Sequence, residues 1–314
     1  MMDANQVIEA FKTKTSSLLV PTSLVPTTSA TATSSVAPIP TVVPNKPTIE
    51  QVGETGTKTL WVVFVVMLLS TLVFAFLSFR VPVQKRLFHV ITTMITLFAT
   101  ISYFAMATGD GNSYAEIVIK EAHKHVPDTV EYVYRQVFWA RYVDWSLTTP
   151  LLLLDLALLA GMDGASIIVA IVADLIMVLL GLFAAFGSTE GQKWGYYAMA
   201  CVAYLVIVYL LVVSGRRAVS AKDNKTAKLF ASIGGYTLLL WTLYPIVWGI
   251  GDGARKWSVD SEIIAYAVLD ILAKPVFGFW LIFAHASSNP QSIEGWWSHG
   301  LSNEGAIRID DDGA

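Results

Sequence analysis

The sequence predicts an all-α membrane protein in which seven transmembrane helices form an up-and-down bundle. The first observation is composition: 54% of the 314 residues are hydrophobic and 14% are charged, whereas soluble domains carry about 25% charged residues. The second is a series of apolar stretches near the length that crosses a bilayer, at residues 60–79, 88–107, 133–158, 165–187, 194–214, 229–250 and 262–285. The third is the short connection at 161–164, which makes the third and fourth spans antiparallel neighbours.

Charge and cysteine content exclude other classes of protein. The net charge is −3 and the basic residues are scattered, so we expect no nucleic acid partner. The single cysteine, Cys201, lies inside an apolar stretch and has no partner for an intramolecular disulfide. The first 20 residues lack the continuous apolar core of a signal peptide. Membrane targeting is therefore expected to rest on the spans themselves.

The flanking segments differ from the bundle in composition. Residues 1–58 are expected to form a disordered extracellular tail, because residues 21–48 are Pro, Ser, Thr, Ala and Val with almost no charge. The bundle is predicted at 59–286 and a cytoplasmic tail at 287–314. Basic residues gather at 80–86 and at 215–228, which the positive-inside rule assigns to the cytoplasm. The N-terminus is then outside, and residues 109–130 form an outside loop.

The seventh span carries two charged residues, Asp270 and Lys274. A charge at the middle of a bilayer costs about 2.5–3.5 kcal/mol on insertion scales, so such residues are rare and usually functional. A spacing of four places both side chains on one helix face. A buried lysine is the usual residue for a Schiff base, and a structural ion pair between packed helices is the alternative.

The third span contains Arg141, Asp144 and Asp155 in otherwise apolar surroundings. Thr148 lies one turn after Asp144. Asp155 follows Asp144 by 11 residues, which returns to nearly the same face about 16 Å further along the axis. Two carboxylates on one helix face suggest successive proton-binding groups of a proton path. The alternative is that they are polar residues that pack between helices. The lone Asp174 in the fourth span is interpreted as a packing residue.

The sixth span places aromatic residues three to four positions apart, which is one helix face. They indicate either ordinary packing or an aromatic wall around a flat apolar ligand, and the set is Trp241, Tyr244 and Trp248 with Pro245 among them. Pro245 is expected to kink the span. Asp252 and Glu262 flank the loop that follows and, as loop carboxylates, say little alone.

Three motifs together resemble the microbial rhodopsins, most closely the fungal light-driven proton pumps. They are RYVDWSLTTPLLLLD at 141–155, W-x-x-Y-P-x-x-W at 241–248 and D-x-x-x-K at 270–274. The resemblance covers about 59–286. It implies that Lys274 carries all-trans retinal as a protonated Schiff base, with Asp144 as primary counterion and proton acceptor and Asp270 as second counterion.

The resemblance implies further roles. Arg141 would balance the negative charge near the two counterions, Thr148 would bond Asp144, and Asp155, kept protonated among leucines, would be the internal proton donor. Asp252 and Glu262 would be the extracellular proton-release pair. The other implied positions are Tyr103, Trp145, Trp241, Tyr244, Pro245, Trp248 and Trp194 in the retinal pocket, Met177 and Gly181 near the ring of retinal, and Thr149 with Asp174 as a link between spans.

Two positions depart from bacteriorhodopsin. Asp252 replaces a glutamate, and Pro275 follows Lys274 where bacteriorhodopsin has another residue. Because proline lacks the N–H that would bond the carbonyl of Ile271, we expect the helix to adjust beside the chromophore.

The resulting hypothesis is a light-driven outward proton pump, not an enzyme, held as a multi-pass protein in the plasma membrane. Its partners are the lipid bilayer and protons, and the family resemblance also allows a homo-oligomer. The main alternative is a photosensory rhodopsin that signals through a partner, which the carboxylate at Asp155 and the short C-terminal tail disfavour. A pump for another ion or a channel is disfavoured by the carboxylates of the third span. A retinal-free relative is disfavoured by Lys274.

Overall fold

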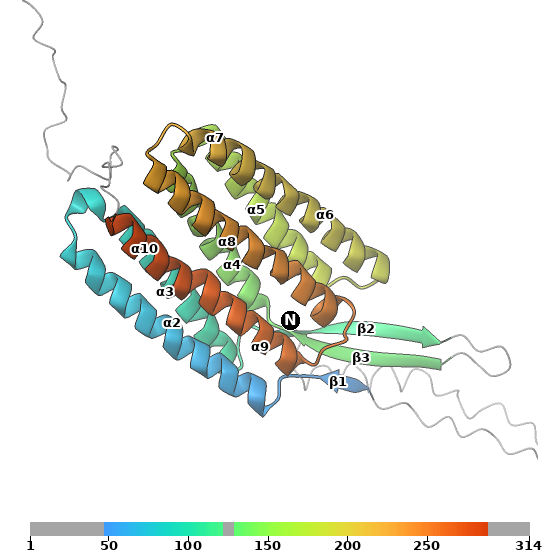
Figure 1. Cartoon of the computed structure of the whole chain (residues 1–314). Coiled ribbons are helices and arrows are strands. Elements are labelled where there is room, and N and C mark those ends of the chain that lie inside the picture. Colours follow the sequence, from blue (N-terminus) through green and yellow to red (C-terminus); the bar gives the residue numbers. More distant parts are fainter. Residues whose placement is uncertain (1–46, 122–128, 288–314) are drawn as a thin grey trace, which may run out of the picture.

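The computed structural model describes residues 47–121 and 129–287, and within them seven helical segments are long and apolar enough to cross a membrane (Figure 1). The first four are α2 (Glu54–Arg80), α3 (Leu87–Ala107), α4 (Trp139–Ala160) and α5 (Gly164–Ala185). The fifth comprises α6 (Glu190–Tyr209), η2 (Leu210–Gly215) and α7 (Arg216–Val219). The sixth comprises α8 (Asn224–Trp248) and η3 (Gly249–Gly253), and the seventh α9 (Val259–Ile271), η4 (Leu272–Val276) and α10 (Phe277–Ser287). The predicted seven-helix membrane fold is confirmed.

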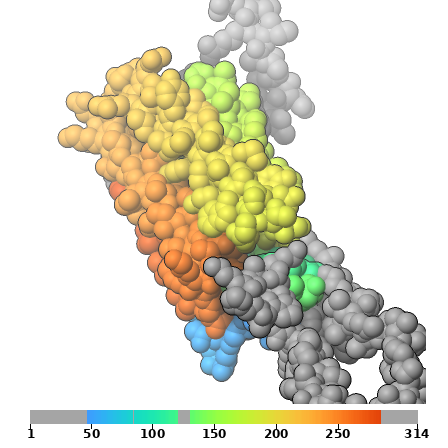
Figure 2. Space-filling model, turned by 90° about the vertical axis from the view of Figure 1, so that its right-hand side faces the viewer, coloured from blue at the N-terminus to red at the C-terminus, as the bar shows by residue number. Residues whose placement is uncertain are grey.

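The outer surface of the bundle is apolar. Large side chains such as Val62, Leu72, Leu205 and Leu239 are more than half exposed. A helix that is hydrophobic on its outer as well as its inner face belongs in a membrane. Figure 2 shows one side of the bundle, formed largely by the fifth and sixth spans, coloured yellow to orange.

Aspartates begin two of the helices at one end of the bundle. Asp163 accepts a hydrogen bond from the backbone N–H of Ser166 at 2.9 Å and precedes α5. Asp223 accepts from the N–H groups of Lys225 and Thr226 and precedes α8. Such caps satisfy donors that the first turn leaves unpaired. Hydrogen bonds from Ser166 and from Thr226 lower the pKa of the two carboxyl groups, respectively.

A three-stranded sheet stands at the opposite end of the bundle, next to the first turns of α2 and α9 (Figure 1). Its strands are β1 (Thr48–Glu50), β2 (Ser113–Glu121) and β3 (Thr129–Val137). The order is β1-β3-β2, with β1 parallel and β2 antiparallel to β3. The register places Glu50 opposite Arg135.

The sheet corrects three predicted boundaries. Residues 109–130 were expected to be a loop, but much of this segment belongs to the hairpin. The third span was expected from 133, yet β3 continues to Val137 and α4 begins at Trp139. Residues 48–58, assigned to the tail, contain β1 and the start of α2. The apolar and β-branched residues of 129–137 satisfy a hydropathy criterion, but hydrogen bonding to β1 and β2 makes this segment a strand. The rest of the tail predicted at 1–58, which is residues 1–46, lies outside the described residues, and so do residues 288–314 of the tail predicted at 287–314.

The seventh helix widens where Pro275 interrupts its hydrogen bonds. Residues Leu272–Val276 form a π turn, and the N–H of Phe277 donates to the carbonyl oxygen of Leu272, five residues earlier. The hydroxyl of Tyr236 donates to the same carbonyl at 3.1 Å. The expected adjustment beside Lys274 is therefore a π turn, a feature that is frequent at functional sites.

Candidate functional site

Lys274 lies inside the bundle, with 1% of its surface exposed. It stands in η4 and forms an ion pair with Asp144 of α4. Its Nζ is 3.4 Å from Oδ1 of Asp270, one turn earlier in the same span. The structure thus brings together the lysine and both carboxylates that the sequence singled out.

The two carboxylates have different hydrogen-bond partners. Asp270 accepts from the hydroxyl of Tyr103 at 2.6 Å and from that of Tyr244 at 2.7 Å. Oδ1 of Asp144 has no hydrogen-bond partner among the described residues. Thr148, which was expected to bond Asp144, donates its hydroxyl to the backbone carbonyl of that residue at 2.9 Å. A helical threonine hydroxyl readily reaches the carbonyl four residues earlier.

A cavity of about 820 Å³, including its opening, ends at Lys274. Eight expected pocket residues line it: Trp145, Thr149, Met177, Gly181, Trp241, Tyr244, Pro245 and Trp248. Residues that were not expected in the pocket also line it: Tyr142, Val178, Tyr197, Ala200, Cys201, Tyr204, Tyr266 and Ala273, and Leu152 lines it with them. The unexpected residues come from α4, α5, α6, α9 and η4, so no single local motif predicts the set.

The cavity suits a long apolar molecule with a carbonyl group at one end. Its walls are mostly aromatic and aliphatic, and its charged groups, Lys274 and Asp270, lie together. Retinal is an apolar aldehyde, and a lysine amine is the nucleophile that bonds such a carbonyl. The residues present therefore fit retinal, and Lys274 is the residue that would hold it.

Two predicted pocket positions have other contacts. Tyr103 bonds Asp270 and does not line the cavity. Trp194 also lies outside the lining; its Nε1 donates to Glu190 at 2.9 Å and its ring meets Trp248 edge-on. Its ring lies against Gly253 of η3 and against Trp248, which lines the cavity, so Trp194 supports a wall of the pocket from behind.

Asp155 and Asp174 are both fully buried but differ in contacts. Neither carboxylate oxygen of Asp155 has a hydrogen-bond partner among the described residues, and its neighbours in α4 include the buried Leu156. Asp174 accepts from the hydroxyl of Thr149 at 2.6 Å, so the predicted link between the third and fourth spans is present. A buried carboxylate without partners is much more stable in its neutral form.

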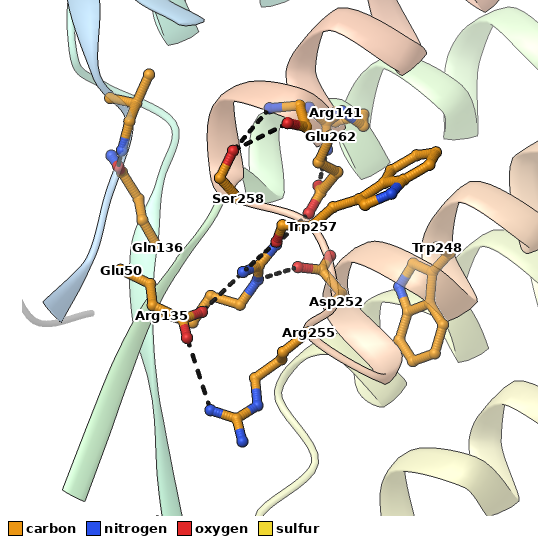
Figure 3. Close-up of polar contacts among 12 residues, drawn as sticks. Glu50, Arg135, Gln136, Arg141, Trp248, Asp252, Arg255, Trp257, Ser258 and Glu262 are labelled. Atoms are coloured by element: carbon orange, nitrogen blue, oxygen red, sulfur yellow. Dashed lines mark hydrogen bonds and ion pairs between the residues drawn. The ribbon is translucent and has the colours of Figure 1, made fainter. Parts of the chain in front are cut away.

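A cluster of ionic residues closes the end of the bundle that carries the sheet (Figure 3). Arg135 of β3 is its centre and contacts Glu50, Asp252 and Glu262. Both Asp252 and Glu262 are buried, with 6% and 4% exposed, and are not the solvated loop residues that their sequence positions suggest. Burial alone would lower the pKa of Arg135, but Glu262 and Asp252 outweigh it and raise that pKa.

Arg141 belongs to this cluster. Its Nη1 donates to Oε1 of Glu262 at 2.9 Å, and its guanidinium lies 4.2 Å from the centre of the Tyr266 ring. The resemblance gives Arg141 the role of balancing negative charge near the counterions of Lys274. Its hydrogen bond goes to Glu262, and the face of Tyr266 also stabilises the guanidinium.

Sequence reasoning missed Arg135 and Glu50. Both lie in strands that were assigned to a span and to the tail. A signal was available in the alternation of TVEYVYRQV at 129–137, which is typical of a strand. It would have excluded Arg135 from a membrane helix without identifying its partners.

Comparison with known proteins gives consistent matches. A family model described as bacteriorhodopsin-like protein matches residues 54–288. The chain is 55% identical over 288 residues to Opsin-1 from Neurospora crassa, covering 90% of this chain and 95% of that protein. The crystal structure of the light-driven proton pump LR (Mac) from Leptosphaeria maculans has a TM-score of 0.75 and 62% identity, covering 77% of this chain and 98% of the other. The light-driven proton pump CsR from Coccomyxa subellipsoidea gives 0.69 and 37%, covering 76% and 100%.

Seven apolar helices around a cavity that ends at a buried lysine define an integral, multi-pass membrane protein of the rhodopsin class. Within that class, the chain belongs to the bacteriorhodopsin-like family. The predicted resemblance is confirmed. The prediction that the protein is a light-driven transporter or photoreceptor, and not an enzyme, is also confirmed. Retinal is the chromophore of this family.

Proposed function

We propose that the protein is a light-driven outward proton pump whose retinal is bound to Lys274 through a Schiff base. The observation that carries the proposal is the arrangement around Lys274. Its buried amine lies between the carboxylates of Asp144 and Asp270, which differ in their other hydrogen bonds, and a third buried carboxylate, Asp155, lies further along α4. The similarity to LR (Mac) and CsR, both described as light-driven proton pumps, supports it.

Bound retinal supplies absorption of visible light and a light-driven change of shape at the lysine nitrogen. In the proposed resting state, Lys274 Nζ holds a proton that Asp144 and Asp270 stabilise, because opposite charges at close distance favour the charged form. Asp144 then accepts the proton, since its Oδ1 has no other partner among the described residues. Asp270 keeps its charge because two tyrosine hydroxyls already donate to it.

Asp155 is proposed to return a proton to Lys274 Nζ. Its burial without polar partners among the described residues keeps the carboxyl protonated at rest. Asp155 and Asp144 lie about 16 Å apart along the helix axis, so donor and acceptor are at different depths of the membrane. Transport is proposed to have one direction because Asp144 and Asp155 lie at different depths and hold protons with different affinities.

The proposed exit runs through Arg141, Glu262 and Asp252 at the end of the bundle that carries the sheet. We propose that this end faces outside, because the basic segments 80–86 and 215–228 at the other end fit the cytoplasm. Residues 1–46 would then be an extracellular tail and residues 288–314 a cytoplasmic one. The plasma membrane is the proposed location.

The test is illumination of expressing cells supplied with all-trans retinal in unbuffered medium. Light should acidify the medium reversibly, and a protonophore should abolish the change. An unchanged pH with an intact visible absorption band would refute the pump and favour a photosensory role. Light-driven alkalinisation would refute the proposed direction of transport.

A further inference from the structure

We infer that Arg135 is a positioning residue that keeps both Asp252 and Glu262 ionised in the resting protein, so that this pair holds no proton before illumination. The inference extends the proposed function, since the pair lies on the proposed exit. It concerns the dark state, however, and can be tested whether or not the protein pumps.

The guanidinium of Arg135 has a carboxylate at each of its three nitrogens (Figure 3). Nε donates to Oδ1 of Asp252 at 3.0 Å, Nη2 to Oε2 of Glu262 at 2.7 Å, and Nη1 to Oε2 of Glu50 at 2.7 Å. Arg135 is 2% exposed. A planar, permanently charged group with donors in a fixed fork is suited to this bridging geometry.

Two buried carboxylates close together would ordinarily share one proton, because burial and mutual repulsion both disfavour two charges. Here the cations balance the acids. Arg135 and Arg141 both contact Glu262, and Arg135 also contacts Asp252. Glu50 is opposed by Arg135 and by Arg255 at 3.7 Å.

Every element around the pair contributes to this balance. The three carboxylates come from β1, η3 and α9, and the three guanidinium groups from β3, α4 and the segment after η3. Two charged groups outside the cluster also act on its arginines: Asp144 interacts with Arg141 and Glu190 with Arg255. The other titratable groups that interact with the cluster are phenols, which are neutral at physiological pH: Tyr103, Tyr142 and Tyr266. Each of the three carboxylates has at least one guanidinium group in direct contact, and this contact stabilises its ionised form.

The fold makes the close approach possible. The parallel pairing of β1 with β3 sets Glu50 opposite Arg135. Gly251 lies against Glu262, and a Cβ at this glycine would be 2.9 Å from Oε2. Arg255 adopts a left-handed backbone with φ of 52°, which is uncommon for a residue other than glycine and ends the turn that follows Asp252.

The experiment is dark-state infrared spectroscopy of the full-length, retinal-loaded protein in lipid nanodiscs near pH 7, which detects protonated carboxyl groups by their C=O stretch. Arg135→Gln should gain a band equivalent to about one protonated carboxyl per molecule. That band should vanish when Asp252→Asn and Glu262→Gln are added together. Arg135→Lys, which keeps the charge, should show no new band.

Two further variants separate charge from contact. Glu50→Gln weakens the same β1–β3 contact but removes a negative charge, so both carboxylates should stay ionised. Arg80→Gln removes an exposed arginine at the other end of the bundle and should also leave the spectrum unchanged. An Arg135→Gln spectrum without a new band would overturn the inference. So would loss of a protonated-carboxyl band when Glu262→Gln or Asp252→Asn is made in the otherwise unchanged protein, a measurement that does not depend on whether Arg135→Gln folds.

Discussion

Asp144 and Asp270 flank the same nitrogen of Lys274, but only Asp270 is saturated by other donors. Tyr103 and Tyr244 each donate to one oxygen of Asp270, whereas Oδ1 of Asp144 has no partner among the described residues. A carboxylate that already accepts two hydrogen bonds is stabilised as an anion, and one with a free oxygen is the better proton acceptor. The geometry therefore divides the roles between two residues of the same chemistry.

Replacing each carboxylate by its amide tests this division. Asp144→Asn should reduce light-driven acidification by more than about tenfold, because it removes the acceptor, and tenfold corresponds to only about 1.4 kcal/mol. Asp270→Asn should retain measurable transport with a shifted absorption maximum, since a fixed charge is lost but the acceptor remains. Both are measured by flash spectroscopy and by pH recording. Equal loss of transport in the two variants would contradict the division of roles.

Lys274→Ala should abolish the visible absorption band after addition of all-trans retinal, because the amine that bonds the carbonyl is gone. Lys193→Ala is the matched control: this lysine is also buried, at 4% exposed, but lies outside the cavity lining. Circular dichroism checks that both variants keep their helices. A visible band of normal intensity in Lys274→Ala would disprove the attachment site.

Asp155→Asn should slow recovery of the photocycle by about 10²-fold or more at neutral pH, the usual effect of removing a positioned proton donor. The decay of the transient absorption change after a flash measures this. Asp174→Asn is the control, because it alters a buried carboxyl group that is bonded to Thr149. The donor role fails if the Asp155→Asn decay equals that of the unsubstituted protein.

Pro275→Ala should raise thermal stability while altering the photocycle. Proline inside a helix is unfavourable by about 3 kcal/mol relative to alanine, and the new N–H lets the π turn at 272–276 return to an α-helix. That change would move Lys274 relative to Asp144. Tyr236→Phe removes the hydroxyl contact to Leu272 without changing the backbone and serves as control. Unchanged absorption and kinetics in Pro275→Ala would mean that the π turn does not position the lysine.

The Asp163 cap predicts a pH-dependent stability. Its pKa is lowered in the folded protein by hydrogen bonds from Ser166, so the cap stabilises above the unfolded pKa of about 3.9 and the stabilisation is lost as the pH falls through the lower folded value. Asp163→Ala should therefore lower the Tm at pH 7, with a difference that shrinks in acid. Asp163→Asn should keep the cap and a Tm near that of the unsubstituted protein at pH 7. A Tm difference for Asp163→Ala that persists unchanged in acid would contradict the charge-dependent cap.

The sequence by itself determined the features that depend on near neighbours in the chain. Apolar length predicted the seven spans, the spacing of four put Asp270 and Lys274 on one face, and the third-span motif identified Asp144 and Asp155. Helical periodicity is a local property, so these predictions needed no knowledge of packing. The local effect of Pro275 followed in the same way from its missing N–H.

Only the tertiary structure decided which distant groups meet. The bonds of Tyr103 and Tyr244 to Asp270 join α3 and α8 to α9. The Arg135 cluster joins positions 50, 135, 252 and 262, and two of its strands were mistaken for a tail and for part of a span. The sequence shows that burying a charged residue costs free energy, but it does not identify the partner that offsets this cost. That partner is determined by how helices and strands pack.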